Sequence, residues 1–289
     1  MRRRDFVRAS AALPIAGLEV ARGADPSSRT SPRGRASYRH SVTRWPFSDW
    51  SLEELCETAV DLGIESVELV QPTDAPVLEA HSLTCAMTAH PPDVPDALRK
   101  GWNRTEHHEH LIPAYRRALQ AVAEVGWPNL ICFSGNRDGL EDAAGLENMA
   151  RGLEQILPDA ERLGVTLCLE LFNSKVDHPD YQADSTAWGV ALVDRLGSNR
   201  FKLLYDIYHM QIMEGDVIRT ILDNQGAIAH FHVAGVPGRN NPDETQELFY
   251  PAIMRALDEA GFPGFVGQEF VPAGDPRAAL EDAVRRCSV

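Results

Sequence analysis

From residue 38 onward, short apolar runs alternate with amphipathic segments, and this alternation limits the fold more than any other feature of the chain. The runs have the length of buried strands, and the segments between them have the apolar spacing of helices packed by one face. Such an alternation predicts βαβ units and a parallel sheet that is covered on both sides. The eight predicted strands are 38–43, 64–69, 83–88, 129–133, 165–170, 201–206, 228–233 and 264–270.

The segments between these strands predict helices, and most of them end in a glycine that suits the turn into the next strand. Ser51 followed by Glu54 predicts a capping box at the first helix, and the Pro-rich stretch 72–81 gives the weakest helical pattern. Eight units in about 250 residues favour a single (β/α)8 TIM barrel, an α/β fold, over an open doubly wound sheet. No glycine-rich phosphate loop follows any strand. The predicted helices are 51–63, 110–126, 147–164, 185–197, 216–226 and 250–261.

The N-terminal segment differs from the rest and resembles a twin-arginine export signal. Arg3, Arg4 and Phe6 stand before a stretch of small and apolar residues, although Glu19 interrupts it and no A-x-A cleavage site follows. We therefore expect a disordered signal-like segment and linker over 1–37 and the barrel over 38–289. The protein is expected to be exported to the periplasm, or to be cytoplasmic if this segment is only a disordered basic tail.

Composition narrows the class of partner. The formal net charge is −14, with 42 acidic and 28 basic residues, so the chain repels a phosphate backbone and no nucleic-acid partner is expected. No apolar run approaches the roughly 20 residues of a membrane-spanning helix. The five cysteines form no C-x-x-C pair and are predicted to be buried free thiols. The expected partner is a small molecule, with a homo-oligomer left open.

Four of the predicted strands end in side chains that could bind a metal ion. They are Glu170, Asp206, His232 and Glu269, on four consecutive strands. The carboxyl ends of barrel strands meet at one rim, so these side chains are expected to lie together. Three adjacent carboxylates raise one another's pKa, and a divalent cation removes that repulsion. The oxygen-rich set with one imidazole suits one Mn²⁺, Mg²⁺ or Co²⁺ ion, with Zn²⁺ as an alternative.

Three more residues near this rim are predicted to contact the substrate: His90, His209 and Arg239. For His209 the simpler alternative is a bond to a backbone carbonyl, and for Arg239 it is exposure in a turn-rich segment. An arginine there could instead clamp a substrate oxygen. Trp45 and Phe47 either line the substrate pocket or are ordinary packing residues of the protein interior. The run "EHHEH" at 106–110 is predicted to be a solvated helix start rather than a metal-binding tract.

The segments "ELFNSK", "YDIYHMQ", "HFHVAGVPGR" and "FVGQEF" together resemble the hydroxypyruvate isomerase group of the xylose isomerase-like barrels. The resemblance extends over residues 38–285. It implies one divalent metal held by Glu170, Asp206, His232 and Glu269. One departure is His232, where members acting on hydroxypyruvate carry Gln; histidine there is similar to the ketose 3-epimerase branch. Related endonucleases with three zinc ions need a D-x-H sequence where this chain has "AGVPGR".

The resulting expectation is a divalent-metal-dependent isomerase of the aldose-ketose type that acts on small α-hydroxy carbonyl compounds, a keto acid or a ketose. Glu170 and Glu269 would be the catalytic pair, moving a proton through an enediolate. The alternatives are a metal-dependent epimerase or lyase of keto-sugars and a non-catalytic sugar-binding barrel. A hydride shift would use a second metal and a strand-end lysine, for which Lys175 and Lys202 are poorly placed.

Overall fold

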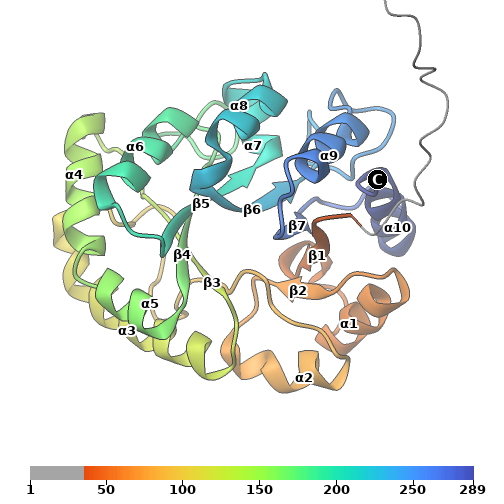
Figure 1. Ribbon diagram of the computed structural model, residues 1–289, viewed down its shortest axis with the longest axis horizontal. Coiled ribbons are helices and arrows are strands. Elements are labelled where there is room, and N and C mark those ends of the chain that lie inside the picture. The colour runs from red at the N-terminus through yellow and green to blue at the C-terminus, as the bar shows by residue number, and fades with distance from the viewer. Residues whose placement is uncertain (1–35) are drawn as a thin grey trace, which may run out of the picture. The chain divides into compact units, whose positions relative to one another are not determined.

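The computed structural model describes residues 36–289, and the predicted export signal lies outside them. The described residues form a compact unit whose strands run parallel in a ring, with the helices on the outside (Figure 1). The order around the sheet is β2-β1-β7-β6-β5-β4-β3, as successive right-handed βαβ units produce. The prediction of a TIM barrel is confirmed. The strands are β1 Arg39–Thr43, β2 Ser66–Glu68, β3 Asn129–Cys132, β4 Thr166–Glu170, β5 Phe201–Asp206, β6 Ile228–Val233 and β7 Phe265–Gln268.

The segment 83–88 closes the ring between β2 and β3, but the prediction that it is a regular strand is wrong. It makes only isolated parallel bridges, Ser66 to Thr84 on one side and Thr88 to Leu130 on the other. Side chains take the hydrogen bonds that a ladder would use at Ala86. Its N–H donates to Ser66 Oγ at 2.8 Å, and its carbonyl accepts from the Asn129 side chain at 2.8 Å.

The helices follow the predicted pattern with three exceptions. The capping box of α1 is confirmed, since Ser51 and Glu54 exchange side-chain and backbone hydrogen bonds. The predicted helix 147–164 is two helices, because Pro158 cannot continue a helix from the preceding turn. The short helix α7, directly after β5, and the C-terminal helix α10 were not predicted. The helices are α1 Leu52–Asp61, α2 Ala75–Ala80, α3 His108–Glu124, α4 Asp142–Leu153, α5 Leu157–Leu163, α6 Thr186–Leu196, α7 Ile207–Met213, α8 Val217–Asn224, α9 Tyr250–Glu259 and α10 Pro276–Arg286.

The strands carry the core. Every residue of β4 is buried, as expected of a parallel strand with side chains packed on both faces. Helix α6 lies close on the sheet at Gly189, where an added Cβ would lie 3.0 Å from side-chain atoms of Leu171 and Leu203. All five cysteines are buried and free, as predicted. Within residues 36–289, no helix has the length and hydropathy needed to cross a bilayer.

The carboxyl ends of the strands place the polar side chains at one rim. Glu68, Glu170 and Asp206 are the last residues of β2, β4 and β5. His232 is the next-to-last residue of β6, and Glu269 directly follows β7. Because all these strands are parallel, the five side chains converge, which is the arrangement that barrel enzymes use for their active sites.

Candidate functional site

Four buried side chains gather at the rim, and they are the four predicted metal ligands. One ligand atom each from Glu170, Asp206, His232 and Glu269 lies within 4.8 Å of the others. His232 Nδ1 lies 3.0 Å from Glu269 Oε2 and 3.4 Å from Glu170 Oε1. None of the four is more than 3% exposed, so their charges are shielded from water. The predicted set is therefore assembled, and its role in metal binding stays a prediction.

Asp206 connects this group to the start of α7. Its Oδ1 accepts from the backbone N–H of Tyr208 at 2.8 Å and from that of His209 at 3.4 Å, which makes it the N-cap of the helix. Oδ2 lies 3.5 Å from the guanidinium of Arg239. One carboxylate oxygen thus fixes the side chain and the other faces the centre of the group.

Glu269 is held on several sides. Its Oε2 accepts from Arg239 at 2.6 Å, and its Oε1 accepts from the indole N–H of Trp45 at 2.7 Å. Burial opposes the charged carboxylate, but His232 and Arg239 outweigh it, so the pKa of Glu269 lies well below its ordinary value. Arg239 itself has a φ of 58°, in the left-handed region that non-glycine residues seldom occupy. Backbone hydrogen bonds to Gly235 and Val271 hold it there.

The pKa values of the other two carboxylates, Glu170 and Asp206, are raised, as expected of adjacent acids. Burial, and then the charge of Glu269, raises the pKa of Glu170. Burial also raises the pKa of Asp206, against the opposing effect of Arg239. Glu170 Oε1 and His232 Nδ1 are both buried without an aligned hydrogen-bond partner. Two orphaned acceptor-capable atoms among three carboxylates are what a divalent cation would satisfy, so the residues present fit such an ion.

A cavity of about 380 Å³ opens beside Glu170 and Glu269. Its polar lining includes His90 and Arg239, two of the three residues predicted to contact substrate. Burial lowers the pKa of His90, which favours the neutral imidazole. The apolar wall is larger than the polar one, and it consists of Trp45, Leu69, Ala89, Leu98, Ile131, Phe133 and Phe172.

His209, the third predicted substrate residue, is not among the residues that line this cavity. It is fully buried, with Nε2 3.5 Å from Asp206 Oδ2 and Nδ1 2.7 Å from the amide of Asn173. Its contact with substrate stays a prediction. Phe47 is also buried, against Phe270, and lies outside the cavity lining, whereas Trp45 lines it.

The stretch 106–110 does begin a helix, since α3 starts at His108. The prediction that it is solvated is wrong for His108, which is 7% exposed. Its Nε2 lies 2.9 Å from the carbonyl of Trp102, so the imidazole is a satisfied part of the core. A local sequence of five polar residues could not show which of them turns inward.

Sequence reasoning missed Glu68 and His230, which form a second buried group with His232. The signal was present, because Glu68 is the next-to-last residue of the predicted strand 64–69, close to the rim where Glu170 and Asp206 were expected. His230 stands two residues before His232, the spacing that puts both on one face of a strand. The predicted ligands came only from the last four strands, with one histidine among them, so neither residue was included.

Comparison with known proteins agrees with the fold. The family model of the xylose isomerase-like TIM barrel matches residues 56–287. A Homo sapiens protein assigned to the hydroxypyruvate isomerases is 34% identical over 247 residues, which cover 86% of this chain and 84% of that protein. A 2-oxo-tetronate isomerase of Cupriavidus necator is 35% identical over 169 residues, covering 57% of this chain and 63% of that protein.

Among solved structures, a Brucella melitensis protein described as a family 2 AP endonuclease superposes with a TM-score of 0.73 at 27% identity. The match covers 84% of this chain and 96% of that one. Family model, relatives and structural neighbour all extend over most of the barrel. The chain belongs to the xylose isomerase-like TIM-barrel family.

Proposed function

We propose that the protein is a divalent-metal-dependent isomerase of small α-hydroxy carbonyl compounds, similar to the hydroxypyruvate and 2-oxo-tetronate isomerases that it resembles. The observation that carries the proposal is the pair Glu170 and Glu269, buried at one rim with Asp206 and His232 and open to one cavity. These four residues would hold a Mn²⁺, Mg²⁺ or Co²⁺ ion. The ion would polarise the substrate carbonyl and make the neighbouring C–H bond more acidic.

The two glutamates would divide the proton transfer because their surroundings differ. Glu269 is ionised and fixed by Trp45 and Arg239, so it is the better group to remove a proton from the substrate carbon. Glu170 lines the same cavity and has an unpartnered Oε1, so this oxygen can carry a proton and return it to the adjacent carbon. His90 and Arg239 would orient the substrate oxygens, and the apolar wall would exclude water from the carbanion.

Hydride transfer without proton exchange has less support in this chain. Lys175 Nζ bonds to the carbonyls of Ile212 and Met213, both at 3.0 Å, and Lys202 Nζ bonds to the carbonyl of Gly226 at 2.7 Å. Both lysines are thus occupied on backbone carbonyls, and neither lines the cavity.

A second candidate is an epimerase of ketoses or keto-sugars that uses the same groups. The cavity favours it, because about 380 Å³ with an apolar wall exceeds what a three-carbon keto acid fills. Epimerisation differs only in that the proton returns to the opposite face of the same carbon. The two reactions would therefore use the same residues, and they differ in the substrate and in the carbon that receives the proton.

A substrate screen in D₂O tests both candidates. The Mn²⁺-supplemented protein is incubated with small keto acids, ketoses and keto-glycosides, and products are identified by NMR. We expect product that carries deuterium at the reacting carbon, because an exchangeable carboxyl group holds the proton between the two steps. Isomerised product without deuterium would indicate a hydride shift, and binding of sugars without turnover would favour the non-catalytic barrel.

We also propose export by the twin-arginine route, which rests on Arg3, Arg4 and Phe6 alone. The double substitution Arg3→Lys, Arg4→Lys keeps both charges but removes the paired guanidinium groups. We expect it to hold the protein in the cytoplasm while the parent reaches the periplasm, as measured by cell fractionation. Equal periplasmic recovery of both chains would contradict the proposal, as would a parent that stays in the cytoplasm.

A further inference from the structure

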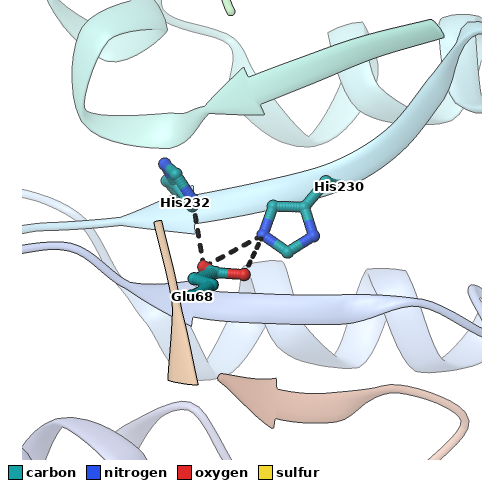
Figure 2. Close-up of side chains that lie close together, drawn as sticks. All are labelled: Glu68, His230 and His232. Atoms are coloured by element: carbon teal, nitrogen blue, oxygen red, sulfur yellow. Dashed lines mark hydrogen bonds and ion pairs between the residues drawn. The ribbon is translucent and has the colours of Figure 1, made fainter. Parts of the chain in front are cut away.

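Behind the metal-binding group lies a buried carboxylate that the proposed mechanism does not use. Glu68, at the end of β2, contacts two histidines of β6, as Figure 2 shows. His232 Nε2 lies 3.1 Å from Glu68 Oε1, and His230 Nε2 lies 3.0 Å from Oε2 and 3.1 Å from Oε1. Glu68, His230 and His232 are all fully buried, so none of the three is exposed to bulk solvent.

Both carboxylate oxygens of Glu68 face imidazole nitrogens in this interior, Oε1 toward His230 Nε2 and His232 Nε2, and Oε2 toward His230 Nε2. A carboxylate buried among such nitrogens is stabilised in its ionised form when they donate to it. An ionised carboxylate has no proton and can only accept hydrogen bonds. The proton in the contact between Glu68 and His232 therefore belongs to Nε2 of the imidazole.

The two nitrogens of His232 face opposite ways. Nε2 faces Glu68, while Nδ1 faces Glu269 and Glu170. When Glu68 holds the proton on Nε2, a neutral imidazole must have its lone pair on Nδ1, the nitrogen that faces the metal-binding group. The other tautomer would carry a proton on Nδ1 and donate it to Glu269, which would block the ligand atom.

The backbone of β7 makes room for this carboxylate. Gly267 is paired with His232 across the ladder, and a Cβ built there would lie 2.0 Å from Glu68 Oε1 and 2.8 Å from His232 Cδ2. Real side chains do not tolerate such distances, so any larger residue would displace the carboxylate or the ring. Glycine at this position is thus a requirement of the contact between Glu68 and His232.

We propose that Glu68 is a positioning residue of the metal centre, which fixes the tautomer and orientation of His232 so that Nδ1 is free to bind the ion. His230 in turn holds Glu68 in place, because its Nε2 lies between the two carboxylate oxygens. The inference rests on the proposed function, because it takes the four predicted ligands as the metal site. It adds to that function a carboxylate–histidine–metal chain that reaches into the barrel interior.

The test is calorimetric titration of Mn²⁺ into the metal-stripped full-length protein and its variants. Glu68→Gln keeps the shape of the side chain but removes the charge, and its amide can donate to Nε2 and stabilise the wrong tautomer. We expect the dissociation constant for Mn²⁺ to rise roughly 10- to 100-fold, the usual effect of losing a partner of a ligating histidine. A ¹⁵N spectrum of the histidines in Mg²⁺-loaded protein should show Nε2 protonated in the parent and Nδ1 protonated in part of the variant.

The matched control is Ser66→Ala, a buried polar change on the same strand. Ser66 Oγ bonds to Ser41 and to the N–H of Ala86 and contacts none of the four predicted ligands. It should lower thermal stability without changing Mn²⁺ affinity, which separates a positioning role from a structural one. Gly267→Ala, which crowds Glu68, should weaken Mn²⁺ binding as Glu68→Gln does.

The outcomes separate this inference from the proposed function. Equal Mn²⁺ affinity and equal ¹⁵N spectra in the parent and Glu68→Gln would overturn the positioning role and leave the metal centre standing. A parent that binds no ion would overturn both. Two ions per chain, of which His230→Asn loses one, would overturn the positioning role in favour of a second ion held by Glu68, His230 and His232.

Discussion

Replacing either Glu170 or Glu269 with glutamine is expected to lower turnover by roughly 100-fold or more, the usual scale for loss of a general base or acid. Glutamine keeps the volume and one oxygen for a metal ion, but its amide can neither take up nor return a proton. In Glu269→Gln, Arg239 and Trp45 also lose the charged acceptor that they hold at 2.6 and 2.7 Å. The measurement is kcat with the substrate found in the screen, at saturating Mn²⁺.

The matched control is Glu214→Gln, at the end of α7. Glu214 is exposed and accepts hydrogen bonds from the N–H and hydroxyl of Thr186, and it does not line the cavity. It should keep full turnover. Full activity in both Glu170→Gln and Glu269→Gln would remove these residues from the proton transfer. Loss of activity in all three variants would indicate general damage to the barrel instead.

Replacing His232 with alanine is expected to cost more metal affinity than any change behind the centre. The substitution removes a proposed ligand atom, so the Mn²⁺ affinity should fall by more than the roughly 100-fold that marks the upper range for outer-shell partners. It also leaves Glu68 with one histidine partner and three carboxylates without the imidazole between them. Calorimetric titration of the metal-stripped protein measures the change.

His108→Ala provides the control, because His108 is a buried histidine outside the predicted ligand set, with Nε2 2.9 Å from the carbonyl of Trp102. That variant should lose stability and keep the affinity of the parent. Elemental analysis of the parent should find close to one divalent ion per chain. Three zinc ions, or no binding under added Mn²⁺, would contradict the proposed centre.

The sequence could predict the ring and most of the rim because both depend on local patterns. Parallel strands of a barrel end at one edge, so residues such as Glu170 and Asp206 could be placed near one another without coordinates. The segment 83–88 could not be recognised as irregular, because its ladder is interrupted by the side chains of Ser66 and Asn129, which come from distant parts of the chain.

The electrostatics of the site depended on contacts that no spacing reveals. Repulsion among three carboxylates predicts raised pKa values, and Glu170 and Asp206 follow that rule. Glu269 does not, because His232 and then Arg239, from the loop after β6, outweigh its burial. The direction of a pKa shift is set by which charges are nearest, and that is a property of the folded chain.

The exposure of Trp45 gives the site an optical reporter. This side chain is 42% exposed, lines the cavity and bonds to Glu269. Trp50 is partly buried, Trp102, Trp127 and Trp188 are buried, and none of these four lines the cavity. Indole emission responds to the charge and polarity next to the ring. A cation bound by Glu269, or a ligand placed against the indole, therefore changes the surroundings of Trp45. The intrinsic fluorescence of the unlabelled protein can follow both events.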